Sequence, residues 1–267
     1  MINISPIHAF SDNFIWMLRA DGSNHVVVVD PGDASPVLAH LDAGALKLSA
    51  ILITHKHADH VGGIAELLNR FPDIPVFGPR GEPIPHRTQA LGEGDRVELG
   101  DLGVEFQVMD VPGHTEGHIA YFGEFAADEG SQRVLFCGDT LFASGCGRVF
   151  SGTFEQLHES LMRIAALPAD TRLYCAHEYT LENIGFAEWV EPESSALAER
   201  KAECFALLDA GRDTVPTTVA LEREVNPFLR IDEPRVVARL RDKGLPADAS
   251  AAQAFTLMRR WKDSEYD

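Results

Sequence analysis

Short apolar runs alternate with helical patterns in the first part of the chain. Residues 13–20 and 26–30 are predicted to be strands joined by a turn at Asp21-Gly22. The second run contains consecutive valines, which is typical of a strand buried on both faces. Ser35-Pro36 predicts the start of a helix that reaches about residue 43, and an apolar strand follows at 50–54. Apolar residues then recur at helical spacing, so we expect an α/β layered domain.

A second group of strand-like segments follows, separated by Gly and Asp turns. A helix at 153–166 and a last strand at 172–175 come after them. The first part is therefore predicted to be two sheets with helices outside, which is a four-layer αββα sandwich. The strand-like segments of the second group are residues 97–99, 104–111, 119–122 and 134–137.

Strand patterns nearly vanish from residue 178 onward. Helical periodicity dominates there and is interrupted by several prolines. We predict a first domain at residues 1–177, of class α/β, and a smaller all-helical domain at residues 178–267. The predicted helices of the second domain are residues 181–190, 194–208, 233–241 and 250–266.

Composition places the chain among ordinary globular proteins, with 45% hydrophobic and 24% charged residues. A formal net charge of −18 argues against a nucleic-acid partner, which would call for a basic face. The sequence starts without a basic segment and an h-region, and no apolar run approaches the ~18 residues that span a bilayer. The four cysteines form no C-x-x-C pair, which fits a reduced protein. We therefore expect a cytoplasmic protein with no membrane partner. We also expect a monomer, because no sequence pattern typical of a subunit interface stands out.

The densest cluster of metal-ligand residue types follows the predicted strand at 50–54. Side chains two apart on extended backbone point the same way, so His55 and His57 can bind one ion. Asp59 and His60 then turn in another direction, which favours two ions over one. The alternative is a polar surface loop that is rich in histidine.

Three later strands each end near another ligand-type residue, namely His114, Asp139 and His177. Taken singly, a histidine after a strand is more often structural. Taken together with the first cluster, these residues place ligand types at the ends of four separate strands, where scaffolds usually carry chemistry. Imidazole and carboxylate ligands without thiolate suit Zn²⁺, Fe or Mn.

This pattern resembles the metallo-β-lactamase superfamily and, within it, the glyoxalase II group of hydroxyacylglutathione hydrolases. The histidine cluster alone identifies the superfamily, and the later segments narrow the resemblance to the group. The segments that carry it are Thr54 through His60, Pro112-Gly113-His114-Thr115 with Gly117-His118, Gly138-Asp139-Thr140-Leu141-Phe142, Gly145-Cys146-Gly147-Arg148, His177-Glu178-Tyr179-Thr180, Asn226-Pro227-Phe228, and Met258-Arg259-Arg260 with Lys262.

The resemblance implies a binuclear metal site and a thioesterase. Two divalent ions, expected to be Zn²⁺ with Fe or Mn as alternatives, would share a hydroxide that attacks S-(2-hydroxyacyl)glutathione. The products from S-D-lactoylglutathione would be D-lactate and glutathione, the second step of methylglyoxal detoxification. Asp59 and Asp139 would act at the reacting centre. The implied ligands are His55, His57 and His114 for one ion, Asp59, His60 and His177 for the other, and Asp139 as the bridge.

The resemblance also assigns a substrate site. Arg148, Tyr179, Arg259 and Lys262 would hold the anionic glutathione part, and guanidinium groups suit carboxylates because they bond bidentately. The alternative for the C-terminal cations is a solvated helical face. Phe150 stands where some relatives have Tyr, so a hydroxyl contact to glutathione is missing.

Two further residues and the function itself have open alternatives. Asp30 and His118 are either partners that orient metal ligands or ordinary structural residues. Other functions on the same fold are a mononuclear-iron sulfur dioxygenase, another hydrolase, or a non-catalytic metal-binding module. A non-catalytic module is expected to have lost ligands, and the set here is intact, which favours an enzyme.

Overall fold

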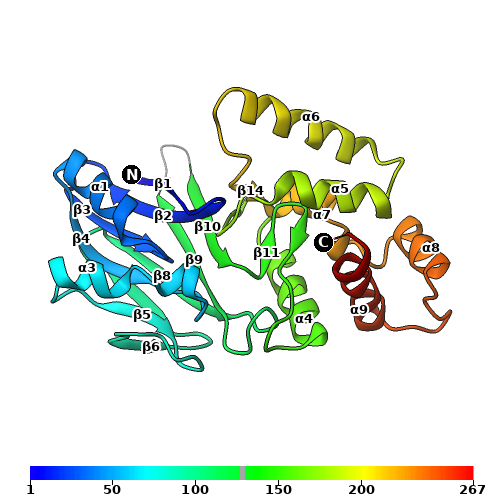
Figure 1. Cartoon of the computed structure of the whole chain (residues 1–267), viewed down its shortest axis with the longest axis horizontal. Helices are drawn as coiled ribbons and strands as arrows, with labels where there is room; N and C mark the ends of the chain where they lie inside the picture. The colour runs from blue at the N-terminus through cyan, green and yellow to red at the C-terminus, as the bar shows by residue number, and fades with distance from the viewer. Residues whose placement is uncertain (127–129, 267) are drawn as a thin grey trace.

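Two six-stranded sheets face each other in the computed structural model, which describes residues 1–126 and 130–266 (Figure 1). In the first sheet, β1 to β3 pair in antiparallel fashion and β3 to β6 in parallel. Its strands, in spatial order, are β1 (Ile2–Ala9), β2 (Asn13–Ala20), β3 (His25–Val29), β4 (Lys47–Leu52), β5 (Val76–Pro79) and β6 (Gln89–Leu91).

The second sheet is antiparallel except where β10 and β13 run parallel. A small hairpin of β11 (Leu141–Phe142) and β12 (Gly145–Cys146) leaves the end of β10. The strands of the second sheet, in spatial order, are β14 (Thr217–Thr218), β13 (Arg172–Cys175), β10 (Ser131–Gly138), β9 (Ile119–Ala126), β8 (Val104–Asp110) and β7 (Arg96–Leu99).

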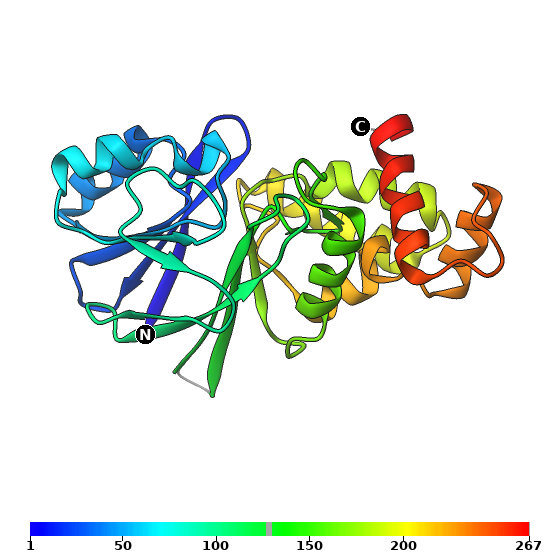
Figure 2. The same cartoon turned by 90° about the horizontal axis from the view of Figure 1, so that it is seen from below.

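Helices cover the outer faces of both sheets, so the predicted αββα layering is confirmed. Helices α1 (Ala34–Gly44) and α3 (Ile64–Arg70) lie on the first sheet, and α4 (Phe154–Ala165) lies beyond the second (Figures 1 and 2). The valine strand β3 shows why both faces are apolar. Val27 and Val29 pack into the core between the sheets, whereas Val26 and Val28 pack under the helices.

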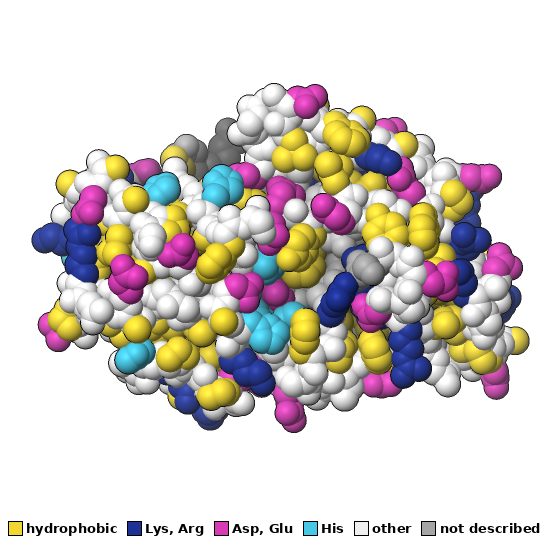
Figure 3. All heavy atoms as spheres, viewed as in Figure 1, with side chains coloured by type: hydrophobic (Ala, Val, Ile, Leu, Met, Phe, Trp, Pro, Cys, Tyr) yellow, Lys and Arg dark blue, Asp and Glu magenta, His cyan; other side chains and the backbone are white. Residues whose placement is uncertain are grey.

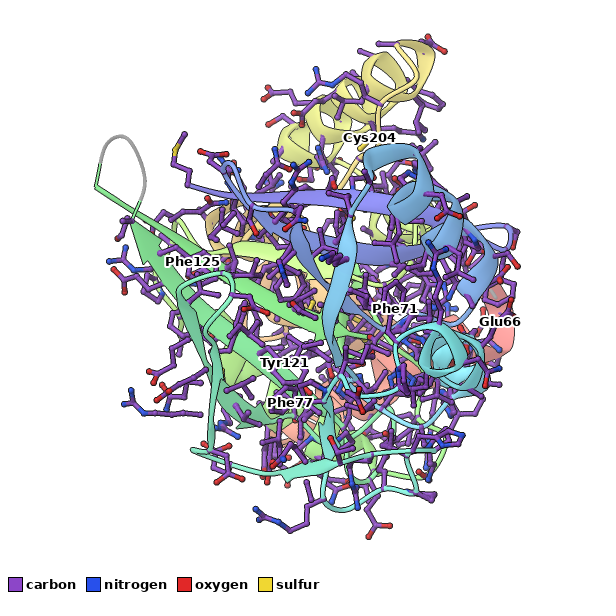
Figure 4. The ribbon with its side chains drawn as sticks, turned by 90° about the vertical axis from the view of Figure 1, so that its left-hand side faces the viewer. Glu66, Phe71, Phe77, Tyr121, Phe125 and Cys204 are labelled. Atoms are coloured by element: carbon purple, nitrogen blue, oxygen red, sulfur yellow. The ribbon has the colours of Figure 1, made fainter. Side chains whose placement is uncertain are left out.

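Aromatic side chains fill part of the space between the sheets. Tyr121 of β9 and Phe77 of β5 lie there in Figure 4, and both belong to the inter-sheet core. The Tyr121 hydroxyl donates a hydrogen bond of 2.8 Å to the carbonyl of Ile53, which satisfies the only polar atom of this buried side chain. This contact fixes the end of β4, from which the histidine cluster departs.

The C-terminal part is mostly helical, as predicted. One expectation was incomplete, because β14 returns from this part and pairs with β13 of the second sheet. A strand of two residues has no periodicity to read. No helix among the described residues has the length and apolar character needed to cross a membrane. The helical elements are α5 (Thr180–Val190), α6 (Ser195–Asp209), α7 (Val219–Val225), the 3₁₀ turn η1 (Pro227–Leu229), α8 (Pro234–Asp242), α9 (Ala251–Trp261) and a π-helical end at Lys262–Tyr266.

Other differences from the sequence-based expectations are local. Strands β1, β5 and β6 were not predicted, and the last two are short with Gly or Pro inside or beside them. Helix α1 begins at Ala34 because the Asp33 carboxylate accepts the Ser35 amide at 2.8 Å, which makes Asp33 the N-cap in place of Ser35.

Candidate metal centre

Four loops bring ligand-type side chains together at one end of the sandwich. They follow β4, β8, β10 and β13 in the chain. Asp59 and His60 belong to helix α2 (Ala58–Val61), which begins directly after His57. The described residues hold three overlapping groups whose ligand atoms lie within 4.8 Å of one another: His55, His57 and His114; His55, His60 and Asp139; and Asp59, His60 and His177.

The first group aims imidazole lone pairs at a common point. His114 Nδ1 lies 2.8 Å from the Arg148 carbonyl, so Nδ1 carries the hydrogen and Nε2 the lone pair. Thr54 donates its hydroxyl hydrogen to Asp30, so it can only accept from His55 Nδ1, and His55 Nε2 also bears a lone pair. Those two Nε2 atoms lie 3.0 and 3.1 Å from His57 Nδ1. One hydrogen on His57 cannot satisfy both, whereas one cation can.

The group of Asp59, His60 and His177, called the second group from here on, has two imidazoles whose outer nitrogens lie close to a carboxylate. His60 Nδ1 lies 3.1 Å from Asp30 Oδ2, and His177 Nδ1 lies 2.7 Å from Asp12 Oδ1. Their Nε2 atoms lie 3.4 Å from Asp59 Oδ2. Carboxylate–histidine pairs of this kind orient imidazole ligands and raise their basicity.

Asp139 lies between the group of His55, His57 and His114 and the group of Asp59, His60 and His177. Its Oδ1 is 3.5 Å from His60 Nε2, and its Oδ2 is 3.4 Å from His177 Nε2 and 3.5 Å from His114 Nε2. The backbone delivers it at the end of β10, where Gly138 has a φ of 49° and a Cβ would lie 2.4 Å from Thr54 Oγ1. A glycine is therefore required beside this carboxylate.

Electrostatics differ between the groups. Burial lowers the pKa of His57 and His114, and burial together with neighbouring imidazoles lowers that of His55 well below its usual range. These rings are neutral near pH 7 and offer lone pairs. Burial also opposes a charge on His177, but Asp139 and Asp59 overcome it and raise its pKa to about 10.

The carboxylates are ionised despite their burial. Burial opposes the charge of Asp139, yet His60 and His177 hold its pKa well below the usual range. The same balance lowers the pKa of Asp59. The second group thus demands positive charge, which a divalent cation supplies with release of the imidazole protons.

The donor set fits bound metal ions. Neighbouring ligand atoms stand 3.0 to 3.5 Å apart, as expected for ligands that share an ion through bonds of about 2.0–2.2 Å. Both ring nitrogens of His60 and the Oδ1 atom of Asp139 are buried without a hydrogen-bond partner in the described structure. Such orphaned atoms are costly unless something binds them.

Further residues hold the ligand loops in place. Asp30 adopts a left-handed φ of 53° and accepts the Thr54 amide at 2.8 Å, in addition to its approach to His60. His118 accepts the Asp139 amide at 3.2 Å and stacks on His55 with ring centroids 4.6 Å apart. These contacts favour the orienting interpretation for Asp30 and His118.

Sequence reasoning missed three residues of this outer layer. Asp12 orients His177, and Asn13 Nδ2 donates to Asp59 Oδ2 at 3.0 Å. Glu82 accepts the backbone amides of Lys56 at 2.6 Å and Gly117 at 3.2 Å, which ties the histidine cluster to the His114 loop. The only available signal was the position of Asp12 and Asn13 at the start of a predicted strand.

A pocket of about 480 Å³ opens beside the ligand cluster. Figure 3 shows His and acidic side chains gathered in the middle of the face, next to a hollow bordered by hydrophobic and cationic side chains. All four expected substrate residues line it. The lining residues are His57, Asp59, His114, Asp139, Phe142, Cys146, Arg148, Phe150, His177, Tyr179, Glu182, Asn183, Arg259 and Lys262.

The cationic wall of this pocket is not a solvated helical face. Arg259 is 0% exposed and Lys262 is 6% exposed. Lys262 Nζ donates to Asn183 Oδ1 at 3.0 Å, and Arg259 Nη1 donates to the Cys146 carbonyl at 3.1 Å. Tyr179 stacks on the His177 ring with centroids 4.7 Å apart and planes 8° apart, so the two walls meet there.

Fold and ligand cluster define a protein of the metallo-β-lactamase superfamily, and the family model of that description matches residues 10–177. A second model, described as the hydroxyacylglutathione hydrolase C-terminus, matches residues 178–265. A hydroxyacylglutathione hydrolase of Cupriavidus metallidurans is 52% identical over 98% of this chain and 99% of its own length. The chain therefore belongs to the hydroxyacylglutathione hydrolase family, which confirms the resemblance inferred from the sequence.

Solved structures show the same fold at greater distance. ETHE1 from Myxococcus xanthus has a TM-score of 0.62 at 24% identity, covering 97% of this chain and 98% of its own. The protein TTHA1623, solved in a di-iron-bound form, has a TM-score of 0.56 at 27% identity and covers 85% of this chain and all (100%) of its own.

Proposed function

We propose that this chain hydrolyses S-(2-hydroxyacyl)glutathione thioesters, such as S-D-lactoylglutathione, to a 2-hydroxy acid and glutathione. The observation that supports this proposal is a cluster of His and Asp side chains that could hold metal ions, in a pocket that is also lined by Arg148, Arg259 and Lys262. The cluster suits hydrolytic chemistry, and the cations suit an anionic peptide thiol. The names of the relatives agree with this pairing.

We propose two divalent ions, held by the groups described above with Asp139 between them. Two ions supply a nucleophile at neutral pH by lowering the pKa of water, and they polarise the acyl oxygen. Nitrogen and oxygen donors without thiolate suit Zn²⁺, Fe or Mn, and Zn²⁺ is our first choice. The di-iron form of TTHA1623 is one instance of two ions on this fold.

The protein's own groups bind and orient the substrate. Arg148, Arg259 and Lys262 supply positive charge for the carboxylates of glutathione, in a chain whose net charge is −18. Burial and the carboxylate of Asp12 raise the pKa of Tyr179, so its phenol stays protonated, and its oxygen can accept a hydrogen bond from the peptide while its hydrogen is donated to Asp12. Phe142 and Phe150 give the same pocket an apolar side.

No protein nucleophile or strong acid is needed. The leaving group is a thiolate whose parent thiol has a pKa of about 8.5, so it departs without a proton from the protein. Cys146 lines the pocket, but burial raises the pKa of its thiol, which leaves it a poor nucleophile. The reaction therefore depends on the ligand cluster for activation and on the rest of the pocket for binding.

We further propose a division of labour between the two parts of the chain. Residues 1–177 hold the ions, and residues 178–267 supply most of the substrate wall. We expect the protein to act as a monomer in the cytoplasm, where its free cysteines would stay reduced.

The test combines metal analysis with a thioester assay on the purified chain. We expect about two metal equivalents per chain and loss of S-D-lactoylglutathione with release of one thiol per turnover. Chelation should abolish the activity, and Zn²⁺ should restore it. Full activity with one ion or none would refute the binuclear site, and oxygen uptake without thioester cleavage would point to a dioxygenase instead.

A further inference from the structure

The hairpin at residues 141–146 stands between two parts of the site. It follows Asp139 directly in the chain and leads to Arg148, whose carbonyl accepts from His114 Nδ1. Two of its side chains, Phe142 and Cys146, line the substrate pocket. Its own ladder consists of two residue pairs, so most of its polar backbone groups need partners elsewhere.

Asn226 supplies the first of those partners from the helical part. Its Nδ2 donates to the Gly145 carbonyl at 2.9 Å and lies 3.4 Å from the Phe142 carbonyl. Its Oδ1 accepts the Phe228 amide at 3.1 Å, which caps the 3₁₀ turn η1. The Asn226 side chain therefore bonds both to the hairpin and to the 3₁₀ turn that follows it in the chain.

Glu222 supplies the second partner. Its Oε2 accepts the Ser144 amide at 2.8 Å and the Asn226 Nδ2 at 2.9 Å, while Oε1 accepts the Thr217 hydroxyl at 2.7 Å. Glu222 and Asn226 are both 0% exposed. A buried carboxylate with three donors is costly to assemble and is retained where it fixes a geometry.

Two pocket residues complete the set. Asn183 Nδ2 donates to the Ala143 carbonyl at 3.1 Å, and Arg259 Nη1 donates to the Cys146 carbonyl at 3.1 Å. Gly145 has no room for a side chain, because a Cβ would lie 2.4 Å from the Asn183 side chain. All five residues from Phe142 to Cys146 are therefore held by side chains of residues 183–259.

We propose that Asn226 and Glu222 are positioning residues that set the hairpin at 141–146 and, through it, the substrate pocket and the His114 side of the ligand cluster. This inference rests on the proposed thioesterase function for its kinetic consequences only. The two residues contact neither the pocket nor the ligand atoms in the described structure, so they act through the hairpin.

A purely architectural role would predict a different outcome. Arg223, on the same helix as Glu222, donates to the Ala165 carbonyl at 2.7 Å and so joins α7 to the end of α4. That contact ties the helical part to the first part without touching the hairpin. Arg223→Ala is therefore the matched control for loss of attachment alone.

The experiment compares Asn226→Asp with Arg223→Ala in the full chain. Asp keeps the volume and the acceptor that caps η1, but it removes the Nδ2 donor and places a carboxylate against two carbonyls and Glu222. We expect faster amide exchange in a peptide covering residues 141–148, a KM for S-D-lactoylglutathione raised about tenfold, and a lower kcat. Arg223→Ala should lower Tm without changing these three quantities.

Glu222→Gln keeps the test open if Asn226→Asp fails to fold. Gln retains an acceptor for Ser144 and loses the charge, so we expect a smaller change in the same exchange and kinetic readouts. Unchanged exchange at 141–148 and unchanged kinetics in a folded variant would overturn the proposal. A wild-type protein without thioesterase activity would refute the proposed function, while the exchange comparison would still decide whether the two residues hold the hairpin.

Discussion

The two walls of the pocket carry opposite charge: one is lined by the carboxylates and imidazoles of the ligand cluster, and the other by Arg259 and Lys262. The ligand wall combines ionised carboxylates with imidazole lone pairs, and the outer nitrogens of His114 and His177 are held by a carbonyl and a carboxylate. The opposite wall places Arg259 and Lys262 against a carbonyl and an amide oxygen. The first wall can hold cations, and the second presents cationic side chains to the pocket, of which Arg259 also pairs with Asp263 at 2.8 Å. We therefore expect changes on the first wall to lower kcat and metal affinity, and changes on the second to raise KM.

Removal of Asp139 should give the largest effect, because this carboxylate approaches imidazoles of both groups. For Asp139→Ala we expect metal content to fall below one equivalent and the thioesterase rate to drop by more than about a hundredfold, the scale reached by loss of an outer partner alone. Metal analysis and steady-state kinetics measure both.

Asp170→Ala is the control for this change. Asp170 is an exposed carboxylate of the same part of the chain, paired with Arg133 at 3.0 Å. Surface pairs of this kind contribute little, so metal content and rate should match the wild type. Equal activity in the two variants would remove Asp139 from the reaction.

Asp12→Ala tests whether a carboxylate that orients a metal ligand, without binding the metal itself, contributes to metal affinity. The Asp12 carboxylate fixes the hydrogen of His177 on Nδ1 and leaves Nε2 free to bind. Its loss should lower metal affinity by about 10- to 100-fold with little change in KM. Competition with a metal-binding dye measures the affinity.

The matched control is Asp213→Ala. Asp213 makes the same carboxylate–imidazole contact with His8 at 2.8 Å, outside the ligand cluster. Metal affinity should not respond to its removal. If Asp12→Ala also leaves the affinity unchanged, the orientation of His177 comes from its stacking on Tyr179 instead.

The contrast between the walls also explains what the sequence could and could not predict. The ligand types are chemically distinctive and follow apolar strands, so residues such as His114 and His177 could be proposed from the sequence alone. Asp12 is one of 41 acidic residues, and nothing in its residue type or its position after a strand distinguishes it from the others. The burial of Arg259 depends on how α9 packs against the hairpin at 141–146, and a helical pattern gives no information on a partner that is distant in sequence.

Lys262→Met tests whether the cationic wall binds the substrate. Met keeps most of the aliphatic stem but loses the charge that faces the pocket and the contact with Asn183. We expect KM to rise about tenfold, as for one charge-assisted hydrogen bond, with kcat within about twofold of the wild type. Adding Arg259→Ala should raise KM further and also lower Tm, because Arg259 is fully buried.

Lys243→Met provides the comparison for this substitution. Lys243 pairs with Glu265 at 2.8 Å and lies over the Trp261 ring, within the same helical part and away from the pocket. Its removal should leave KM unchanged. A loss of kcat in Lys262→Met that exceeds the change in KM would place Lys262 in the chemical step. It would contradict the assignment of the cationic wall to substrate binding.

Phe150→Tyr should have the smallest effect, and it tests where the two walls meet. The ring stands edge-on to His57 and His114, with centroids 5.1 and 5.2 Å away, and Phe150 is 65% exposed at the pocket. We expect a hydroxyl there to contact the glutathione part of the proposed substrate, so KM should fall by roughly two- to tenfold, the scale of one neutral hydrogen bond. Phe205→Tyr, on the exposed face of α6, should change nothing. An unchanged KM in Phe150→Tyr would mean that a hydroxyl at this position makes no contact with the substrate and that the position contributes only its aromatic ring.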